Sequence, residues 1–276
     1  MGRQPMSRSV GSPAGVALRI RLLGNFEVEV GDRAILDSDW RLQKARALVK
    51  LLALAPRHRL RREEVMERLW PELEPEAALN NLYYALHVAR AALDRDLPIT
   101  AGSSSMLQLT DGVVAVPPIV SVIVDVEVFQ AAALAARQSR TASAYVLALD
   151  LYVGELLPED QYADWAARPR ERLRASQLQL LSELALVHED RGEYADAIDA
   201  LRRLTAQEPT HEEACTSLMR LHIAAGQRWN ALREYAQLRT ALREELELEP
   251  SAATRALYAA IIADEGQPRT AQRLSA

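Results

Sequence analysis

Residues 76–94 carry the side chains with the most distinctive chemistry in this sequence. Apolar residues recur there at spacings of three and four, which predicts an amphipathic helix. The opposite face then holds Asn80, Asn81, Tyr83, Tyr84 and His87. An Asn amide can form two hydrogen bonds to an adenine edge, and a Tyr can bind a phosphate or pack on a thymine methyl. The alternative is a plain polar surface or a groove for a partner protein.

Positive charge gathers near the starts of two earlier predicted helices and within this one. Such groups neutralise phosphates, which dominate affinity for nucleic acid. The candidates for phosphate contact are Arg41, Lys44, Arg57, Arg59, Arg61, Arg62 and Arg90. Taken alone, the run RHRLRR at 57–62 is explained slightly better as a solvated loop that supplies charge to a helix end.

No residue pattern indicates catalysis. The single cysteine, Cys215, is predicted to be a small core residue, and the histidines complete no metal-ligand spacing, although His211 lies four residues before it. A G-x-x-x-x-G-K phosphate loop is absent from the sequence. We therefore expect no enzymatic activity, no cofactor and no metal site.

Composition and charge indicate a globular protein of about two domains. The chain has 276 residues, of which 49% are hydrophobic and 26% charged. Residues 1–118 hold 16 Lys and Arg against 14 Asp and Glu, whereas the remainder holds 17 against 24. This weak asymmetry suits a chain that touches nucleic acid with its first domain. The lone cysteine, the absence of a secretory signal and the absence of a long apolar run predict a cytoplasmic location without membrane association.

The first half of the chain alternates between short strands and helices. Residues 18–30 predict two strands around Gly24, and the sequence RAIL adds a third. Helices are predicted at 41–55, 62–70 and 76–94, with RHRLRR as a loop between the first two. A hairpin with Gly102-Ser103 at its tip should follow Pro98. Beyond a boundary at PPIVS, helices are predicted at 125–138, 141–153, 162–190, 193–207, 211–225, 228–245 and 251–264.

The last part of the chain contains an internal repeat. Gly192 and Gly226 are 34 residues apart, and Ala197 matches Ala231 at the same offset. A helix–turn–helix period of 34 residues is typical of tetratricopeptide repeats. The fold class is therefore mainly α with a small β component, ending in an all-α repeat domain of the tetratricopeptide type.

These segments resemble a known family in the order in which they occur. LLGNFEVEVGDRAIL and the stretch from ALVKLLALAPRHRLRR to NNLYYALHVARAAL are similar to the OmpR-type winged helix-turn-helix of the antibiotic-regulatory-protein (SARP-like) activators. VDVEVF, GEYADAIDALRRLTAQEP, EEACTSLMRLHIAAGQ and NALREYAQLRTALREELELEP are similar to their bacterial transcriptional activator domain (BTAD). The resemblance covers residues 18–264.

The resemblance implies a domain order. Residues 18–118 would form the winged helix and residues 122–265 the activator domain, with a disordered leader at 1–17 and a disordered tail at 266–276. Trp165 and the run RPRERLR at 168–174 would begin a long helix that contacts DNA, contacts polymerase or simply faces solvent.

The resemblance also implies a function: sequence-specific binding of double-stranded promoter DNA, as a homodimer or in tandem on direct repeats, with recruitment of RNA polymerase and its sigma factor. Asn80, Asn81, Tyr83, Tyr84 and His87 would then contact bases, and the seven cations would contact the backbone. The family usually has Arg or Lys within this helix, whereas this helix has Tyr83, Tyr84, His87 and Val88. The wing, AGSSSMLQ, carries no positive charge. A scaffold or ligand-sensing regulator with weak DNA binding is therefore the alternative.

Overall fold

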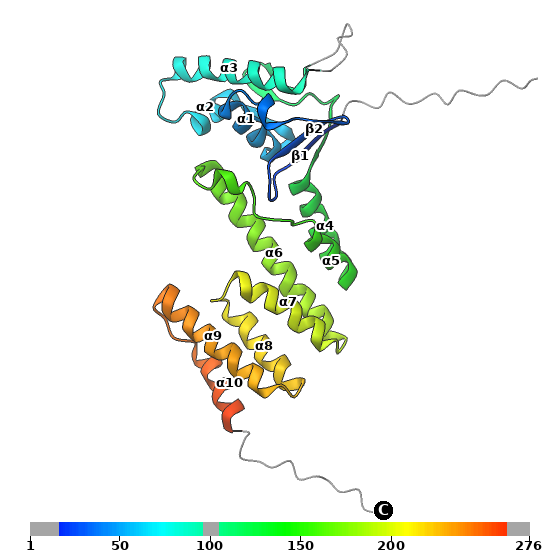
Figure 1. Ribbon diagram of the computed structural model, residues 1–276, viewed down its shortest axis with the longest axis vertical. Coiled ribbons are helices and arrows are strands. Elements are labelled where there is room, and N and C mark those ends of the chain that lie inside the picture. Colours follow the sequence, from blue (N-terminus) through cyan, green and yellow to red (C-terminus); the bar gives the residue numbers. More distant parts are fainter. Residues whose placement is uncertain (1–16, 96–104, 264–276) are drawn as a thin grey trace, which may run out of the picture. The chain divides into compact units, whose positions relative to one another are not determined.

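The computed structural model describes residues 17–95 and 105–263, so the predictions for the leader, the tail and the Gly102-Ser103 tip lie outside these residues. Contacts divide the chain into two compact units. The first comprises Met1–Ala131 with Leu151–Arg174, and the second comprises Ala132–Asp150 with Ala175–Ala276. Figure 1 labels their helices and strands. None of the described helices is long and apolar enough to cross a membrane.

The first unit begins with a four-stranded sheet in the order β3-β2-β1-β7. Leu18 and Ile20 of β1 are buried while Arg19 and Arg21 are exposed, which is the alternation that the sequence predicts. The fourth strand pairs with β1 in parallel and begins at the last residue of the PPIVS segment, so the first sheet includes residues from past the expected boundary. The strands are β1 (Ala17–Arg21), β2 (Glu27–Val30), β3 (Arg33–Ala34) and β7 (Ser121–Val124).

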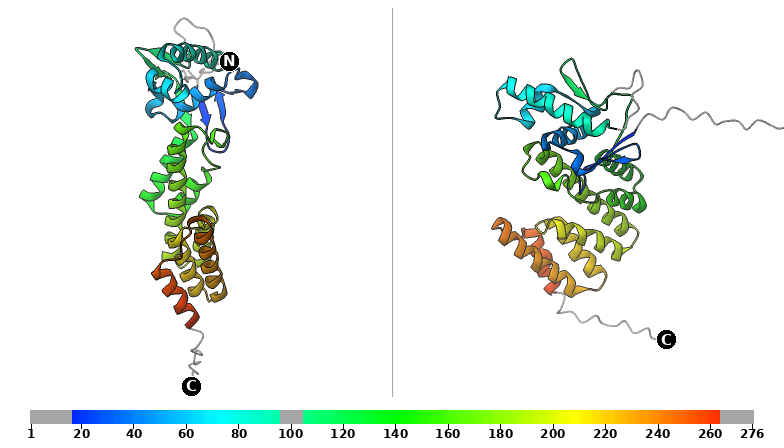
Figure 2. Two further views of the ribbon diagram at one scale, coloured as in Figure 1. Left: turned by 90° about the vertical axis from the view of Figure 1, so that its left-hand side faces the viewer. Right: turned by 45° about the horizontal axis from the view of Figure 1, so that its top comes forward.

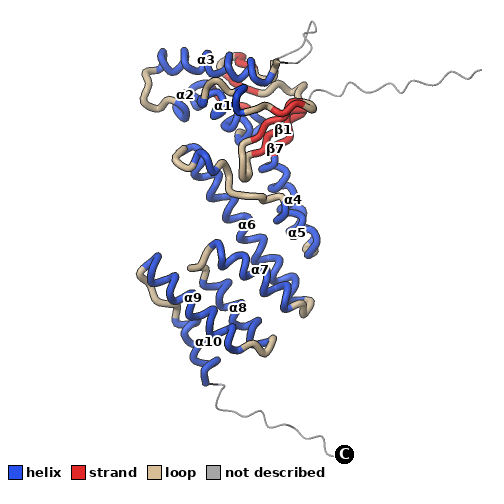
Figure 3. The backbone as a smooth tube through the Cα atoms, viewed as in Figure 1, coloured by secondary structure: helices blue, strands red, loops and turns tan. Residues whose placement is uncertain are grey.

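Three helices pack together beside this sheet, and α3 contacts both α1 and α2 (Figure 3). Their apolar faces confirm the predicted periodicity, because every predicted core position of the third helix is buried. These positions are Ala78, Leu82, Ala85, Leu86, Ala89 and Leu93. The helices are α1 (Gln43–Leu54), α2 (Arg62–Leu69) and α3 (Pro75–Leu93).

A second sheet, in the order β4-β6-β5, corrects one prediction. Part of RHRLRR is a strand rather than a loop, because Leu60 is buried and pairs with Val114. The hairpin of β5 and β6 turns at Asp111-Gly112. Figure 2 shows this hairpin as green arrows. The strands are β4 (Arg59–Arg61), β5 (Gln108–Thr110) and β6 (Val113–Ala115).

Residues 151–174 run across the end of β1 within the first unit. The Gly24 amide donates to the Glu155 carbonyl at 2.9 Å, and the Leu157 amide donates to the Leu22 carbonyl at 2.9 Å. A side chain at Gly154 would meet the Gly24 Cα at 2.9 Å, so this crossing requires glycine. The segment ends with a short turn, Pro158–Asp160, and the first part of α6 (Asp164–Asp190).

This crossing supplies carboxylates to two buried cations of α1. Lys50 is 3% exposed, and its Nζ lies 2.5 Å from Asp160 Oδ2 and 4.7 Å from the centre of the Phe26 ring. Arg46 Nη2 lies 3.3 Å from Glu159 Oε2 and 3.3 Å from Asp37 Oδ1. Buried charges require such partners, because removing them from water is costly.

The second unit contains the repeat. Helices α7 to α10 pack in sequence, and both glycines of the 34-residue offset occupy the left-handed region, with φ of 73° at Gly192 and 72° at Gly226. The residue pair Ala197 and Ala231 is fully buried beside these turns. The helices are α4 (Asp125–Ser139), α5 (Ala142–Asp150), α7 (Tyr194–Gln207), α8 (Glu212–Ala224), α9 (Arg228–Leu246) and α10 (Ala252–Ala263), of which α4 begins in the first unit.

Replacing Lys50 by Met should destabilise the first unit by about 2–4 kcal/mol, because Asp160 would lose its partner while remaining partly buried. Changing both residues, as Lys50→Met with Asp160→Leu, should recover part of this loss. Urea unfolding followed by tryptophan fluorescence measures it. Arg19→Met is the matched control, because the Arg19–Glu29 pair is exposed and spans 3.8 Å. A Lys50→Met effect no larger than that of Arg19→Met would contradict the prediction.

Candidate nucleic-acid interface

The predicted base-contact residues lie together on the exposed side of α3. Tyr83 and Tyr84 are 49% and 59% exposed, and Asn80, Asn81 and His87 are exposed as well. Within the described residues, the two Asn side chains and His87 make no hydrogen bond or ion pair. Pro75 begins the helix, and its buried apolar side fixes it against α1 and α2. A rigid helix therefore presents amide, phenol and imidazole groups that are available to a ligand.

Two arginine side chains hold the C-terminal end of this helix. Arg90 is half-buried, and its Nε donates to the Leu107 carbonyl at 2.9 Å, which ties α3 to the residues before β5. Arg33 Nη2 donates to the carbonyls of Ala92 and Leu93 at 2.9 and 3.0 Å, so it caps the C-terminus of α3. Arg90 thus has a positioning role besides the predicted backbone contact. The sequence analysis missed Arg33, because nothing in the sequence brings it next to a helix 59 residues away.

Strand β4 places two cations side by side. Arg59 and Arg61 are exposed, whereas Leu60 between them is buried under the hairpin. Neither guanidinium forms a hydrogen bond or ion pair with another described residue. Arg57, also exposed, precedes them with a left-handed φ of 56°, followed by His58 at 51°. Such φ values cost energy for residues with a side chain, and they turn the chain sharply from α1 into β4.

Arg62 is engaged locally at the start of α2. Its Nε lies 2.7 Å from Glu63 Oε1, and this hydrogen bond raises the pKa of Arg62 and lowers that of Glu63. Its backbone amide donates to the Gly112 carbonyl at 2.8 Å. Gly112 has a φ of 75°, which favours glycine at this turn. Arg62 therefore links α2 to the tip of the hairpin.

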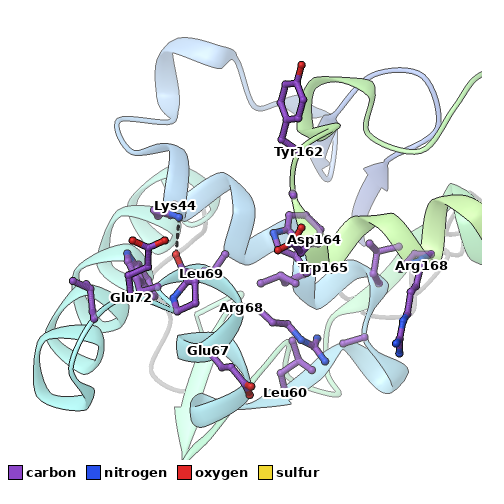
Figure 4. Close-up of a pocket in the computed structure, with 18 of the residues that line it drawn as sticks. Lys44, Leu60, Glu67, Arg68, Leu69, Glu72, Tyr162, Asp164, Trp165 and Arg168 are labelled. Atoms are coloured by element: carbon purple, nitrogen blue, oxygen red, sulfur yellow. Dashed lines mark hydrogen bonds between the residues drawn. The ribbon is translucent and has the colours of Figure 1, made fainter.

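Lys44 has a structural partner, whereas Arg41 has none among the described residues. The Lys44 Nζ donates to the Leu69 carbonyl at 2.6 Å, where α2 ends, and lies 6.0 Å from the centre of the Trp70 ring (Figure 4). Trp70 is half-buried. Of the predicted phosphate-contact residues, Arg41, Arg57, Arg59 and Arg61 are therefore unpaired in the described structure, whereas Lys44, Arg62 and Arg90 are engaged.

A groove of about 1100 Å³ lies beside Lys44, between the end of α2 and the start of α6 (Figure 4). Trp165, Arg168 and Arg172 line it from α6, and Arg68 lines it from α2. By contrast, Arg170 points its guanidinium at backbone carbonyls, with Nε 3.0 Å from the Leu156 oxygen. Within the run 168–174, Arg170 therefore supports the fold, whereas Arg168 and Arg172 are exposed.

Cys215 is unsuited to nucleophilic chemistry. It is 3% exposed, and burial raises the pKa of its thiol to about 12. Its Sγ lies 3.3 Å from the Glu234 carbonyl, within the apolar core of α8, α9 and α10. This agrees with the prediction of a small core residue.

Comparison with known proteins agrees with this architecture. The family model described as "Bacterial transcriptional activator domain" matches residues 124–262. The regulatory protein AfsR of Streptomyces coelicolor is 28% identical over 260 residues, which are 90% of this chain and 25% of AfsR. The transcriptional regulator RedD of the same organism is 29% identical over 91% of this chain and 72% of RedD. The chain therefore spans about a quarter of the length of AfsR.

A solved structure shares the fold. Mycobacterium tuberculosis EmbR, determined in complex with a low-affinity phosphopeptide, superimposes with a TM-score of 0.70 at 20% identity. The match covers 92% of this chain and 66% of the EmbR chain. The architecture predicted from the sequence, a winged helix followed by a helical domain, is confirmed.

Replacing Arg90 by Met should loosen the hairpin, because the Leu107 carbonyl loses its donor while the alkyl part of the side chain remains. Loss of about 1 kcal/mol would speed amide exchange of residues 107–114 roughly fivefold. Hydrogen–deuterium exchange with mass spectrometry measures this. His87→Ala, one turn earlier and exposed, should leave the exchange unchanged. Equal protection in both variants would show that Arg90 does not position the hairpin.

Proposed function

The chain belongs to the family of the bacterial transcriptional activator domain, and on this basis we propose that it binds specific promoter DNA through its winged helix. It is a transcription regulator of the SARP-like type. We further propose that it acts as an activator in the cytoplasm, without enzymatic activity of its own.

The observation that carries this proposal is the free polar face of α3. Asn80, Asn81 and His87 are exposed and have no partner among the described residues, and Tyr83 and Tyr84 lie on the same side. An α-helix fits the major groove, where amide and aromatic side chains can distinguish adenine and thymine from the other bases. Side chains that held the fold together would be expected to have partners within the protein.

The phosphate contacts would come from residues outside α3. Arg57, Arg59 and Arg61 lie beside the hairpin, and Arg41 precedes α1. Their guanidinium groups are unpaired in the described structure, so they are available for phosphates. Because the exposed face of α3 carries no Lys or Arg, these four residues would provide most of the electrostatic affinity.

Transcription activation requires a second contact, with RNA polymerase or its sigma factor. The groove lined by Trp165, Arg168 and Arg172 is a candidate, because it combines a half-buried aromatic ring with exposed guanidinium groups. Binding as a homodimer, or as two copies on a direct repeat, would add affinity to the few phosphate contacts of one chain.

A second candidate function is a protein-interaction scaffold or ligand-sensing regulator with weak DNA binding. The absence of Lys and Arg from the exposed centre of α3 favours it, together with the two exposed tyrosines, which are typical of protein interfaces. DNA binding separates the two functions. No preference for the protein's own upstream DNA over unrelated DNA at low salt would exclude the promoter-binding proposal.

The double variant Arg59→Ala with Arg61→Ala should weaken DNA binding and make it less sensitive to salt. Loss of two phosphate contacts should reduce the slope of log K against log salt by about 1.8. Fluorescence anisotropy with labelled upstream DNA measures the slope. Arg19→Ala with Arg21→Ala removes the same charge from β1, where each guanidinium already pairs with a glutamate. The proposal fails if both double variants change the slope equally.

Asn80→Ala and Asn81→Ala test base reading separately from phosphate binding. An Asn that binds adenine should contribute about 1–3 kcal/mol of discrimination at one A·T pair, and its loss should relax the preference at that pair alone. Competition with operators changed at single positions measures this, and the salt slope should stay unchanged. A uniform loss of affinity across all operators would contradict a base contact by that residue.

A further inference from the structure

We propose that His188, Glu193 and Asp196 form a binding site for one divalent transition-metal ion at the turn between α6 and α7. One ligand atom from each side chain lies within 4.8 Å of the other two. An imidazole nitrogen and two carboxylate oxygens are a donor set that Zn²⁺ accepts, with its remaining position open to water. The site lies in the second unit and does not depend on the DNA-binding proposal.

The turn itself brings the three ligands together. His188 stands near the end of α6, Glu193 precedes α7, and Asp196 lies in the first turn of α7. Gly192, with its φ of 73°, reverses the chain between them. His188 is held in place, because its side chain is 14% exposed and its Nδ1 lies 2.6 Å from Glu193 Oε2. The two carboxylates face solvent, so a hydrated ion can reach them.

The next repeat provides an internal comparison. At the same 34-residue offset, the equivalent residues are His222, Gln227 and Asn230. His222 Nδ1 lies 2.9 Å from Gln227 Oε1, and Asn230 Nδ2 donates to the same oxygen at 3.1 Å. Neutral amides therefore close this turn with the same geometry, so the structure of the turn does not require carboxylates. The first turn carries two negative charges that its counterpart lacks.

The groups that surround the histidine of each turn also differ. His222 is fully buried, and its Nε2 faces Arg202 at 3.4 Å and Glu234 at 3.6 Å, so it is enclosed by α7 and α9. Among the described residues, the His188 side chain contacts the Glu193 carboxylate, and the Asp196 carboxylate lies close to both. An ion bound there would connect the end of α6 to the start of α7 and stabilise the folded repeat in proportion to its occupancy.

Calorimetric titration of the full chain with ZnCl₂ tests the proposal, with thermal unfolding in the presence and absence of the metal as a second readout. The wild type should show one saturable site and a melting temperature that rises with Zn²⁺. The variant Glu193→Gln with Asp196→Asn copies the polar groups of the second turn, so it should fold normally. Its affinity should fall by more than about 100-fold, since loss of outer-sphere partners alone costs 10–100-fold.

Two controls separate this site from adventitious binding. His188→Gln should also abolish the saturable site, whereas His87→Gln, which removes an exposed histidine elsewhere, should retain it. The proposal is overturned if the wild type binds no Zn²⁺ saturably. It is equally overturned if Glu193→Gln with Asp196→Asn, folded as judged by its metal-free melting temperature, binds Zn²⁺ with unchanged affinity.

Discussion

The carboxylate of Asp125 joins the elements on which the first unit depends. It accepts the backbone amides of Leu22 and Leu23 at the end of β1, each at 2.9 Å, and that of Val126 in the first turn of α4 at 2.8 Å. Burial raises the pKa of Asp125, while these amides favour its ionised form. One side chain thereby satisfies donors from segments about 100 residues apart, which would otherwise be left unpaired.

This connection has consequences for the position of the domain boundary. The segment at 151–174 belongs to the matched activator-domain family, yet it packs with the winged helix in one compact unit. Its Asp160 and Glu159 are the partners of Lys50 and Arg46, two buried cations of α1. A winged helix cut off at residue 118 would lack this segment and both of these carboxylates. The compact unit that contains the winged helix therefore includes residues from beyond the boundary predicted at 118–122.

Sequence periodicity predicted the helices well, because an amphipathic pattern is a local property. The same pattern could not reveal β4, since three residues are too few for a periodic signal and its partner strand lies more than 50 residues away. The hairpin of β5 and β6 was missed for a related reason. Asp111-Gly112 is a turn signal, but it is the pairing of β6 with β5 and with the distant β4 that makes it the tip of a hairpin. A local pattern also cannot show that Lys50 and Arg46 are buried, because their partners Asp160 and Glu159 lie more than 100 residues away.

The sequence could predict the residue types of the candidate site. It could not predict which of the cations hold the fold and which are free. Helical spacing alone placed Asn80, Asn81 and His87 on one face, and the structure leaves them unpaired among the described residues. The cations could not be sorted in this way, because whether Lys44 or Arg90 is free depends on carbonyls at Leu69 and Leu107. Because those two cations hold the fold, the unpaired cations that could contact a phosphate backbone lie mainly beside the hairpin, at Arg57, Arg59 and Arg61. A helix face without Lys or Arg, flanked by positive charge, would obtain specificity and affinity from separate residues.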